Sequence, residues 1–487
     1  MKARKQSLFE ESRLHLRDSI EFSLDSLREY GKRYRHWTTA YSGGKDSSAT
    51  VTFIAWAIRE GHVPAPETWT VLLSDTRQEL PPLISAAMRL MDHLRRDGID
   101  ARVVMPPMDD RFYVYMLGRG VPPPKNRFRW CTPQLKIYPM QFALEDMAVA
   151  RGMGEIVPTK KNRYGRTYAG NGTDKMLMLT GVRMGESAAR DQRIAISCKK
   201  DSGECGQGWF QVATPEALAD TLAPLLHWRL CHIFDWLYFE EKRHGYPEVV
   251  DIAEVYGDDD VRTGCIGCNL VDKDTALMRL LEHHPDKWGH LSPLLELKPL
   301  FRELKKAKHR KRKAEPERNK DGSYAKNGQR LGPLTMEARA WGLDVVLDIQ
   351  KRVNEAANGR EGISLINDEE EARIRELWAL NTWPNGWDGD EIVGDVPVHS
   401  ITVTDAGLVV QPLLFGCAVS MVREMNQGEY LLDDEYVQAG WSLEWDDAGW
   451  CTAVHQEYGR TTSSFPSKSR GLKNLYIKID RLIGSSE

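Results

Sequence analysis

The residues best suited to phosphate chemistry stand in one short glycine-containing stretch near the N-terminus. They are Ser42, Gly43, Gly44, Lys45, Asp46 and Ser47. The stretch follows a β-prone run at 36–41 and opens an amphipathic run that extends to Ile58. Glycines let the backbone approach phosphate oxygens, and a helix start offers free N–H groups and a positive dipole end. Because the spacing G-x-x-x-x-G-K-[ST] is absent, the stretch predicts a phosphate loop other than the common P-loop.

A second candidate for nucleotide binding follows the β-prone run 69–74. The run ends in Asp75, whose carboxylate suits a ribose hydroxyl or a magnesium ion. An aspartate that caps the next helix would have the same sequence signature. Both interpretations of Asp75 stay open at this point.

A third stretch combines a glycine at a strand end with two arginines. Gly181 permits close backbone approach, and Arg183 and Arg190 can hold phosphate oxygens bidentately and offset the charge of a leaving pyrophosphate. Glu186 and Ser187 lie between these arginines. A helix start with i,i+4 charge pairs would explain Glu186 and Arg190, but it leaves the strand-end Gly-Val-Arg unexplained.

The cysteines predict metal or sulfur chemistry. Cys265 and Cys268 form a Cys-x-x-Cys pair whose thiolates can point at one iron or zinc. Cys131 stands among cations that favour its thiolate, and Cys198 and Cys205 flank a turn-like segment. These five cysteines are one more than a four-thiolate site needs. Cys231, by contrast, lies in an apolar helical pattern and is predicted to be a small buried residue.

Over about residues 30–300 these motifs resemble the superfamily of ATP pyrophosphatases and sulfonucleotide reductases. The resemblance implies an ATP and Mg²⁺ site, with cleavage between the α- and β-phosphates. The implied catalytic residues are Lys45, Asp46, Arg183, Arg190 and Cys198, the last as a sulfur relay. The implied nucleotide ligands are Ser42, Gly43, Gly44, Lys45, Asp46, Ser47, Asp75, Gly181, Arg183, Glu186 and Ser187.

The same resemblance implies a four-iron–four-sulfur cluster. Its ligands would be Cys131, Cys265 and Cys268, with Cys205 preferred over Cys198 as the fourth. Zinc remains the alternative metal, because thiolates suit both.

Within the superfamily the motifs are most similar to the DndC/SspD-type proteins of bacterial DNA phosphorothioation, a modification linked to phage defence. That resemblance implies adenylation of a DNA phosphate oxygen by ATP, followed by displacement of AMP by sulfur from a cysteine desulfurase. It also implies other DNA-modification subunits as partners. The chain departs from the pattern because its extra cysteines lie upstream, at 198 and 205.

Three alternatives of other kinds remain. The first is a reductase of adenylylsulfate or its 3′-phosphorylated form, although the Glu204-Cys205-Gly206 letters that resemble its nucleophile motif lie mid-chain. The second is tRNA thiolation, which differs in the polymer. The third is a non-catalytic DNA-docking subunit.

Charge is unevenly distributed along the chain, although the formal net charge is only −4. The run 302–313 holds eight lysines and arginines and predicts DNA as a partner, since such density neutralises phosphates. A solvated basic linker is the alternative. The chain has no apolar run long enough for a membrane span, and its eight cysteines follow no secretion signal, so we expect a cytoplasmic protein.

The pattern of apolar runs predicts an α/β fold. Expected strands at 36–41, 69–74, 101–105 and 176–182 alternate with expected helices at 46–59, 80–96 and 137–150. This alternation is typical of a parallel sheet with helices on both faces and ligands at the carboxyl ends of its strands. Residues 154–175 are expected to form an exposed loop, and 222–244 a helix.

The resemblance makes this fold a parallel-sheet PP-loop (adenine nucleotide alpha hydrolase-like) domain with a C-terminal accessory α+β region. The expected domains are an N-terminal helical segment at 1–35, the PP-loop domain with its cysteines at 36–300, a basic linker and helix at 301–360, and the accessory domain at 361–487.

Overall fold

The computed structural model describes most of the chain in two compact units. The described residues are 15–126, 128–172, 174–185, 192, 203–204, 209–211, 218–257, 263–313, 331–394, 399–404, 407–412, 440–445, 450–456, 459–464 and 478–479. The first unit comprises Met1–Arg310 and Gly332–Gly389, and the second comprises Lys311–Leu331 and Asp390–Glu487. Among the described residues, no helix is both long and apolar enough to cross a bilayer.

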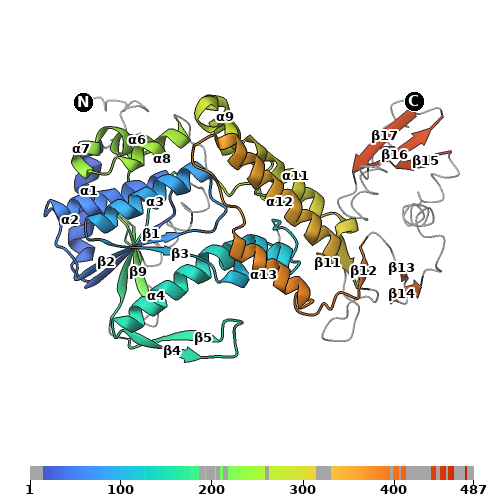
Figure 1. Cartoon of the computed structure of the whole chain (residues 1–487), viewed down its shortest axis with the longest axis horizontal. Coiled ribbons are helices and arrows are strands. Elements are labelled where there is room, and N and C mark those ends of the chain that lie inside the picture. The colour runs from blue at the N-terminus through green and yellow to red at the C-terminus, as the bar shows by residue number, and fades with distance from the viewer. Residues whose placement is uncertain are drawn as a thin grey trace, which may run out of the picture. The chain divides into compact units, whose positions relative to one another are not determined.

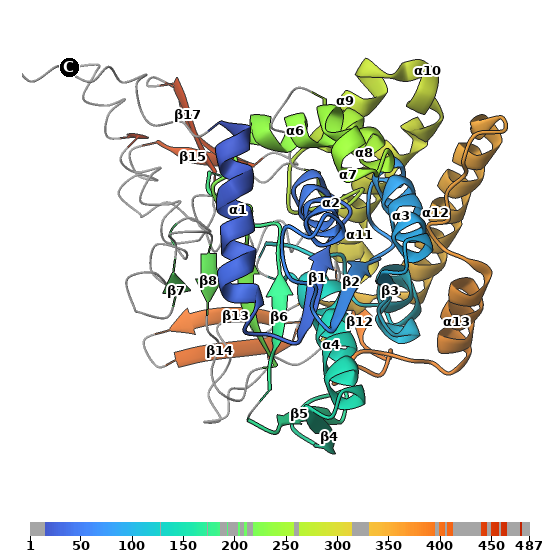
Figure 2. The same ribbon diagram turned by 90° about the vertical axis from the view of Figure 1, so that its left-hand side faces the viewer.

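A seven-stranded sheet forms the centre of the first unit, in the order β3-β2-β1-β6-β9-β8-β7 (Figure 1 and Figure 2). Its strands are β1 (His36–Tyr41), β2 (Thr68–Ser74), β3 (Asp100–Val104), β6 (Met176–Leu179), β7 (Gly203–Glu204), β8 (Trp209–Gln211) and β9 (Ala219–Ala223). The five strands from β3 to β9 pair in parallel, and β8 and β7 add on antiparallel. The predicted α/β fold is therefore confirmed.

Helices cover both faces of this sheet. Above it in Figure 1 lie α1 (Leu16–Gly31), α2 (Lys45–Arg59), α3 (Pro81–Arg96), α6 (Leu230–Phe239), α7 (Glu241–His244) and α8 (Glu248–Tyr256), and below it lies α4 (Tyr138–Ala150). Successive residues of β2 serve opposite faces, as strand geometry requires. Val71 and Leu73 pack with the upper helices, whereas Leu72 packs with Leu144 and Met147 of α4.

The first unit contains a further helical layer, formed by segments that follow the sheet in the sequence. It comprises α9 (Thr275–His283), α10 (Pro285–Trp288), α11 (Leu297–Leu304), α12 (Met336–Ala357) and α13 (Asp368–Ala379). Short 3-10 and π-helical segments accompany it at Met108–Asp110, Val114–Gly118, Pro133–Ile137, Gly289–Glu296 and Ala307–His309. Thr335 caps α12 by accepting a hydrogen bond from the Ala338 amide, and Asn367 with Glu370 forms a capping box on α13. These helices, up to Gly389, belong to the first unit.

Two sequence-based expectations about secondary structure are only partly right. Residues 154–175 contain an antiparallel hairpin of β4 (Gly154–Pro158) and β5 (Arg166–Gly170). The expected helix at 222–244 overlaps β9, and helix begins only at Leu230. A short apolar strand buried between two others has no periodicity that separates it from a helix, so only the pairing reveals β9.

The described strands of the second unit are short. They are β12 (Ile392–Val393), β13 (His399–Thr404), β14 (Gly407–Pro412), β15 (Ser442–Trp445), β16 (Trp450–His455) and β17 (Gly459–Ser464). Two further strands are β10 (Arg310–Arg312), which lies within the basic run 302–313, and β11 (Leu331–Leu334). Antiparallel pairing joins β13 with β14, and β15 with β16 and β17.

His244 is a buried titratable group in the helical face above the sheet. Its side chain is fully buried, its Nε2 lies 3.2 Å from the carbonyl oxygen of Trp236, and its Nδ1 accepts the amide of Tyr246 at 3.1 Å. Burial lowers the pKa of His244 from 6.5 to about 4. The folded protein therefore holds this imidazole in its neutral form at neutral pH.

Acid should accordingly destabilise the first unit through His244. Because the pKa in the folded state is lower than in the unfolded state, the stability it contributes is complete above pH 6.5 and is lost as the pH falls towards 4. A shift of this size corresponds to ~3 kcal/mol. Denaturant titrations at several pH values should show the free energy of unfolding of the wild type falling between pH 6.5 and 4. The same plot for His244→Asn should be flatter. Equal slopes in the two proteins would contradict the assignment.

Candidate nucleotide and thiol site

The predicted phosphate loop lies between β1 and α2, at the carboxyl end of the sheet. Gly43 has φ +74°, a conformation that glycine adopts without strain. The Ser47 hydroxyl donates to the Gly44 carbonyl at 3.0 Å and accepts the Ser42 amide at 3.3 Å. These bonds fold the loop into a compact turn in front of the first turn of α2.

The segment after β6 lies directly against this loop. A Cβ atom on Gly181 would come within 2.9 Å of backbone atoms of Asp46 and Ser47, so only glycine fits without displacement. Arg183 Nε donates to Asp46 Oδ1 at 2.5 Å, and Lys45 Nζ lies 3.6 Å from Asp46 Oδ2. The carboxylate of Asp46 therefore holds two cations beside the loop. The structure thus brings together the loop and the Gly181–Arg183 segment, which were predicted from two separate stretches.

One cavity of about 440 Å³ joins the phosphate loop to the cysteine loop. Its lining includes residues 42–47, Glu79, Lys136, Gly181, Tyr256, Thr263 and Cys265. The Lys45 ammonium lies 4.5 Å from the centre of the Tyr256 ring, and the Tyr256 and Thr263 hydroxyls are 2.7 Å apart. Sequence reasoning missed Tyr256 and Glu79, because a tyrosine ending a helix and a glutamate in a turn carry no motif.

Lys136 and Glu79 add a charged pair to the wall of this cavity. Lys136 Nζ lies 3.4 Å from Glu79 Oε1, and Glu79 also accepts the Thr76 amide and hydroxyl at 3.1 and 2.7 Å. Burial opposes the charge of Lys136, but the neighbouring Glu79 carboxylate outweighs burial, and the pKa of Lys136 is raised. A positive charge therefore lines the same cavity as the phosphate loop and Cys265.

The structure gathers three of the predicted cysteines in one neighbourhood. Burial raises the pKa of Cys265 to about 12, and the thiols of Cys268 and Cys131 add to that effect. The pKa of Cys131 is also raised, by burial first and by Cys268 as well. In the metal-free protein Cys131 and Cys265 are therefore protonated, and a metal would have to displace their protons.

The described residues do not by themselves complete a metal site. Among them, no three cysteine, histidine, aspartate or glutamate side chains form a group that could hold a metal ion. Cys205, the preferred fourth ligand, and Cys198 lie outside the described residues, as do Glu186, Ser187 and Arg190. The cluster and its ligand set stay a prediction.

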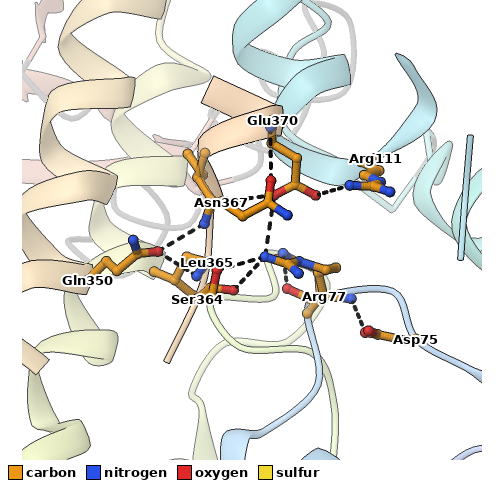
Figure 3. Close-up of polar contacts among 10 residues, drawn as sticks. Asp75, Arg77, Arg111, Gln350, Ser364, Leu365, Asn367 and Glu370 are labelled. Carbon is orange, nitrogen blue, oxygen red and sulfur yellow. Dashed lines mark hydrogen bonds and ion pairs between the residues drawn. The ribbon is translucent and has the colours of Figure 1, made fainter. Parts of the chain in front are cut away.

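Asp75 lies at the end of β2 but faces a different cavity, of about 220 Å³. Its carboxylate accepts the Arg77 amide at 2.8 Å, and burial raises its pKa. Arg77 has φ +59° and donates to the carbonyl and hydroxyl of Ser364, with Glu370 at 3.4 Å (Figure 3). Asp75 thus stabilises a left-handed turn that anchors the helical layer, and its role towards ribose or magnesium stays a prediction.

Cys231 corrects another expectation, because it is exposed rather than buried. It lies at the start of α6, whose buried face is formed by Ile233, Trp236 and Leu237. The apolar pattern identified the helix correctly but assigned this residue to the wrong side.

Residues 36–269 match the family model described as the phosphoadenosine phosphosulfate reductase domain. The match covers slightly less than half of the 487-residue chain, and it includes the phosphate loop, Gly181 and both residues of the Cys-x-x-Cys pair. Together with the parallel sheet, it supports the predicted superfamily for this domain. It does not distinguish among the branches of that superfamily.

Other comparisons add little on function. No curated protein matches the chain significantly. Among solved structures, the phosphoadenylyl-sulfate reductase from Candida auris in complex with phosphate is 11% identical, with a TM-score of 0.28 over 52% of this chain and 94% of that one. The U34-tRNA thiolase NcsA from Methanococcus maripaludis with its 4Fe-4S cluster is 10% identical, with a TM-score of 0.27 over 60% of this chain and 82% of that one. Likeness at this level does not decide an activity.

Two glycines in the same cavity provide a matched test of the nucleotide site. Gly181→Ala places a methyl group against the backbone of Asp46 and Ser47 and should weaken ATP binding about tenfold or more, which corresponds to about 1.4 kcal/mol. Gly264→Ala, which has nothing within 4 Å of the new methyl group, should bind within about twofold of wild type. Calorimetric titration with ATP measures both. Equal affinities would show that nucleotide binds elsewhere.

Thiol substitution tests the metal prediction. The double variant Cys265→Ser with Cys268→Ser should lose iron and the brown colour after anaerobic purification, because two predicted ligands are removed. Cys231→Ser, on the exposed side of α6, should keep both. Colourless, iron-free wild-type protein would exclude the cluster, and stoichiometric zinc would support the alternative metal.

Proposed function

We propose that the protein uses ATP to activate a phosphate group of a nucleic acid and then replaces one oxygen by sulfur, as in DndC/SspD-like DNA phosphorothioation. The observation that supports this most is the single cavity that holds the phosphate loop, Lys136 and Cys265. A nucleotide bound on the loop would have its phosphates on the same side as the thiol. Nucleotide and sulfur chemistry would then share one site.

The proposed reaction has two displacements at phosphorus. In the first, a non-bridging oxygen of the phosphodiester attacks the α-phosphorus of ATP, a new P–O bond forms, and the bond to the β-phosphate breaks so that pyrophosphate leaves with the electron pair. In the second, sulfide attacks the activated phosphorus. Where a cysteine desulfurase supplies the sulfur as a persulfide, a thiol first attacks the inner sulfur, so that sulfide is released and a disulfide is left. A P–S bond forms, the P–O bond to AMP breaks, and AMP leaves. No net oxidation or reduction occurs at phosphorus or at sulfide sulfur.

The chain's own residues would bind and orient these groups. The amides at the start of α2 and the ammonium of Lys45 would bind the β- and γ-phosphates, together with Mg²⁺. Arg183, held by Asp46, would offset the charge that develops on pyrophosphate. Lys136 would stabilise an anionic sulfur species arriving near Cys265. An iron–sulfur cluster, if bound, would supply a site for a sulfide ligand, and no step above depends on it.

A second candidate is reduction of a sulfonucleotide, which the description of the matched family favours. The same cavity would then hold the sulfonucleotide, and sulfite would be the product. tRNA thiolation would use the same ATP chemistry on a different polymer, and a docking subunit would show no turnover at all.

Product analysis separates these candidates. Incubation with ATP, Mg²⁺, DNA and a sulfide donor should yield AMP and pyrophosphate, and Lys45→Ala or Asp46→Ala should lower that rate about 100-fold or more through lost charge stabilisation. Lys351→Ala, which removes an exposed lysine of α12, should leave it unchanged. Circular dichroism checks that the variants fold.

Other products would favour the alternative functions. Sulfite from a sulfonucleotide without AMP formation would favour the reductase, and turnover only with tRNA would favour thiolation of tRNA. Mass spectrometry of nuclease-digested host DNA, with and without the protein, should reveal sulfur-containing dinucleotides only when it is present. DNA without such dinucleotides in an intact host system would contradict the DNA assignment.

A further inference from the structure

Three cations on α11 and its last turn share one side of the helix. Lys298, Arg302 and Lys305 follow the spacing i, i+4, i+7, and Lys305 keeps helical backbone angles immediately after α11. Residues at this spacing lie above one another on a helix. The apolar side of α11, with Leu297, Phe301 and others, packs into the core. Of the three, Lys298 is buried, Arg302 is exposed and Lys305 is partly exposed, so the accessible positive charge lies towards the end of α11.

This side of α11 lies against the cysteine loop. Lys298 Nζ donates to the carbonyl of Cys268 at 2.7 Å and to Asp274 at 2.8 Å, and Arg302 Nη2 donates to the carbonyl of Asp272 at 2.8 Å. A Cβ atom on Gly267 would come within 2.8 Å of the Phe301 ring. The Cys-x-x-Cys loop and α11 are thus in direct contact.

A fourth cation joins these three from the loop that leads to Cys131. The segment that carries the exposed Lys125 packs near α11, because the Trp130 ring stacks on Phe112 with centroids 5.4 Å apart and Phe112 lies 5.6 Å from Phe301 of α11. Consistent with this, burial together with the charges of Arg302, Lys125 and Lys298 lowers the pKa of Lys305. Asp274 compensates Lys298. For Lys125, Arg302 and Lys305, the described part of the chain offers no carboxylate at ion-pair distance. Three cations thus stand together uncompensated beside the cysteines.

The rest of the basic run is engaged differently. Lys306 and Lys308 pair with Glu303 at 2.6 and 2.7 Å, and Lys313 pairs with Glu391 at 2.7 Å. Arg310 is buried and donates to the carbonyl of Gly332. The run 302–313 is therefore not one uniform cationic strip, and only its first part lies beside the cysteine loop.

An exposed aromatic ring stands next to Lys125. Phe128 is 43% exposed, and a turn holds it to Lys125 through backbone bonds of 2.8 and 3.3 Å. Cys131 follows three residues later. An exposed ring beside cations is the combination that stacks an unpaired base while the phosphates are neutralised.

We propose that Lys125, Arg302 and Lys305 bind the phosphates of a single-stranded or locally unpaired nucleic acid at the rim of the cysteine loop, with Phe128 stacking on a base. An open surface with a neighbouring ring suits a polymer, whereas a lone phosphate group would need a closed cradle like that at Gly43. The proposal deepens the proposed function, on which it rests for the role of the polymer. Binding in this way would bring the phosphate backbone of the nucleic acid to the edge of the cysteine loop, on the side of α11.

Anisotropy titrations of labelled single-stranded DNA and RNA over a series of salt concentrations test this surface. The triple variant Lys125→Gln, Arg302→Gln, Lys305→Gln should bind at least about tenfold more weakly and lower the slope of log K against log salt by about 2, because each lost phosphate contact contributes about 0.7. A control with the same charge change, Lys306→Gln, Lys308→Gln, Lys313→Gln, should stay within about twofold. Phe128→Ala should weaken binding about tenfold without changing the salt slope.

The outcomes separate this surface from the proposed chemistry. Unchanged affinity and slope in the first triple variant, or an equal loss in the control, would overturn the proposal. So would binding of 3′-phosphorylated nucleotides alone, without any polymer. ATP affinity, measured in parallel, should be unchanged in both triple variants and verifies their folding. Polymer binding through this rim without AMP formation would keep the surface and reject the activation chemistry.

Discussion

The close approach of the Gly181 backbone to the first turn of α2 is the constraint on which the site depends. Parallel pairing of β1 with β6 places the two strand ends side by side, and the absence of a side chain at Gly181 lets them meet at van der Waals distance. Asp46 then bridges Lys45 and Arg183 across this junction. The phosphate loop and the flanking Arg183 are thereby fixed by one contact between the end of β6 and the start of α2.

The thiol side of the cavity depends on packing from outside the sheet. Gly267, with φ +65°, lets the Cys-x-x-Cys loop turn tightly against Phe301 of α11, and Lys298 fixes the Cys268 carbonyl. Burial keeps the thiols of Cys131 and Cys265 protonated, while the charge of Lys136 lines the cavity that Cys265 shares with the phosphate loop. The helical layer therefore both supports the thiols and adds cations to their rim.

Local motifs predicted much of this arrangement. The loop 42–47 and the strand-end Gly181 were found from sequence because glycine, lysine and hydroxyl residues at a strand–helix junction have a local physical meaning. Tyr256 and Glu79 were not, because only tertiary packing brings them to the cavity. The strand β9 escaped prediction because a short buried run has no distinguishing period.

The density of basic residues in the sequence was the poorest guide to the surface charge of the folded protein. The run 302–313 looks uniformly basic in the sequence. In the structure, however, Glu303 and Glu391 form ion pairs with some of its lysines. Lys305 has no such carboxylate partner among the described residues. The fold could be predicted because the pattern of apolar residues extends over many positions. The pairing of each surface charge, by contrast, depends on a single neighbouring side chain. The position of Cys231 on the exposed side of α6 shows the same limit for a single residue.

The central claim is that nucleotide phosphates and the Cys265 thiol share one cavity. A crystal structure with an ATP analogue that cannot be cleaved between the α- and β-phosphates measures this most directly. We expect the β- and γ-phosphates on the amides of residues 43–47, with the α-phosphorus facing Cys265 and no protein atom between them. Phosphates bound away from the loop, or a chain segment separating them from Cys265, would contradict the account.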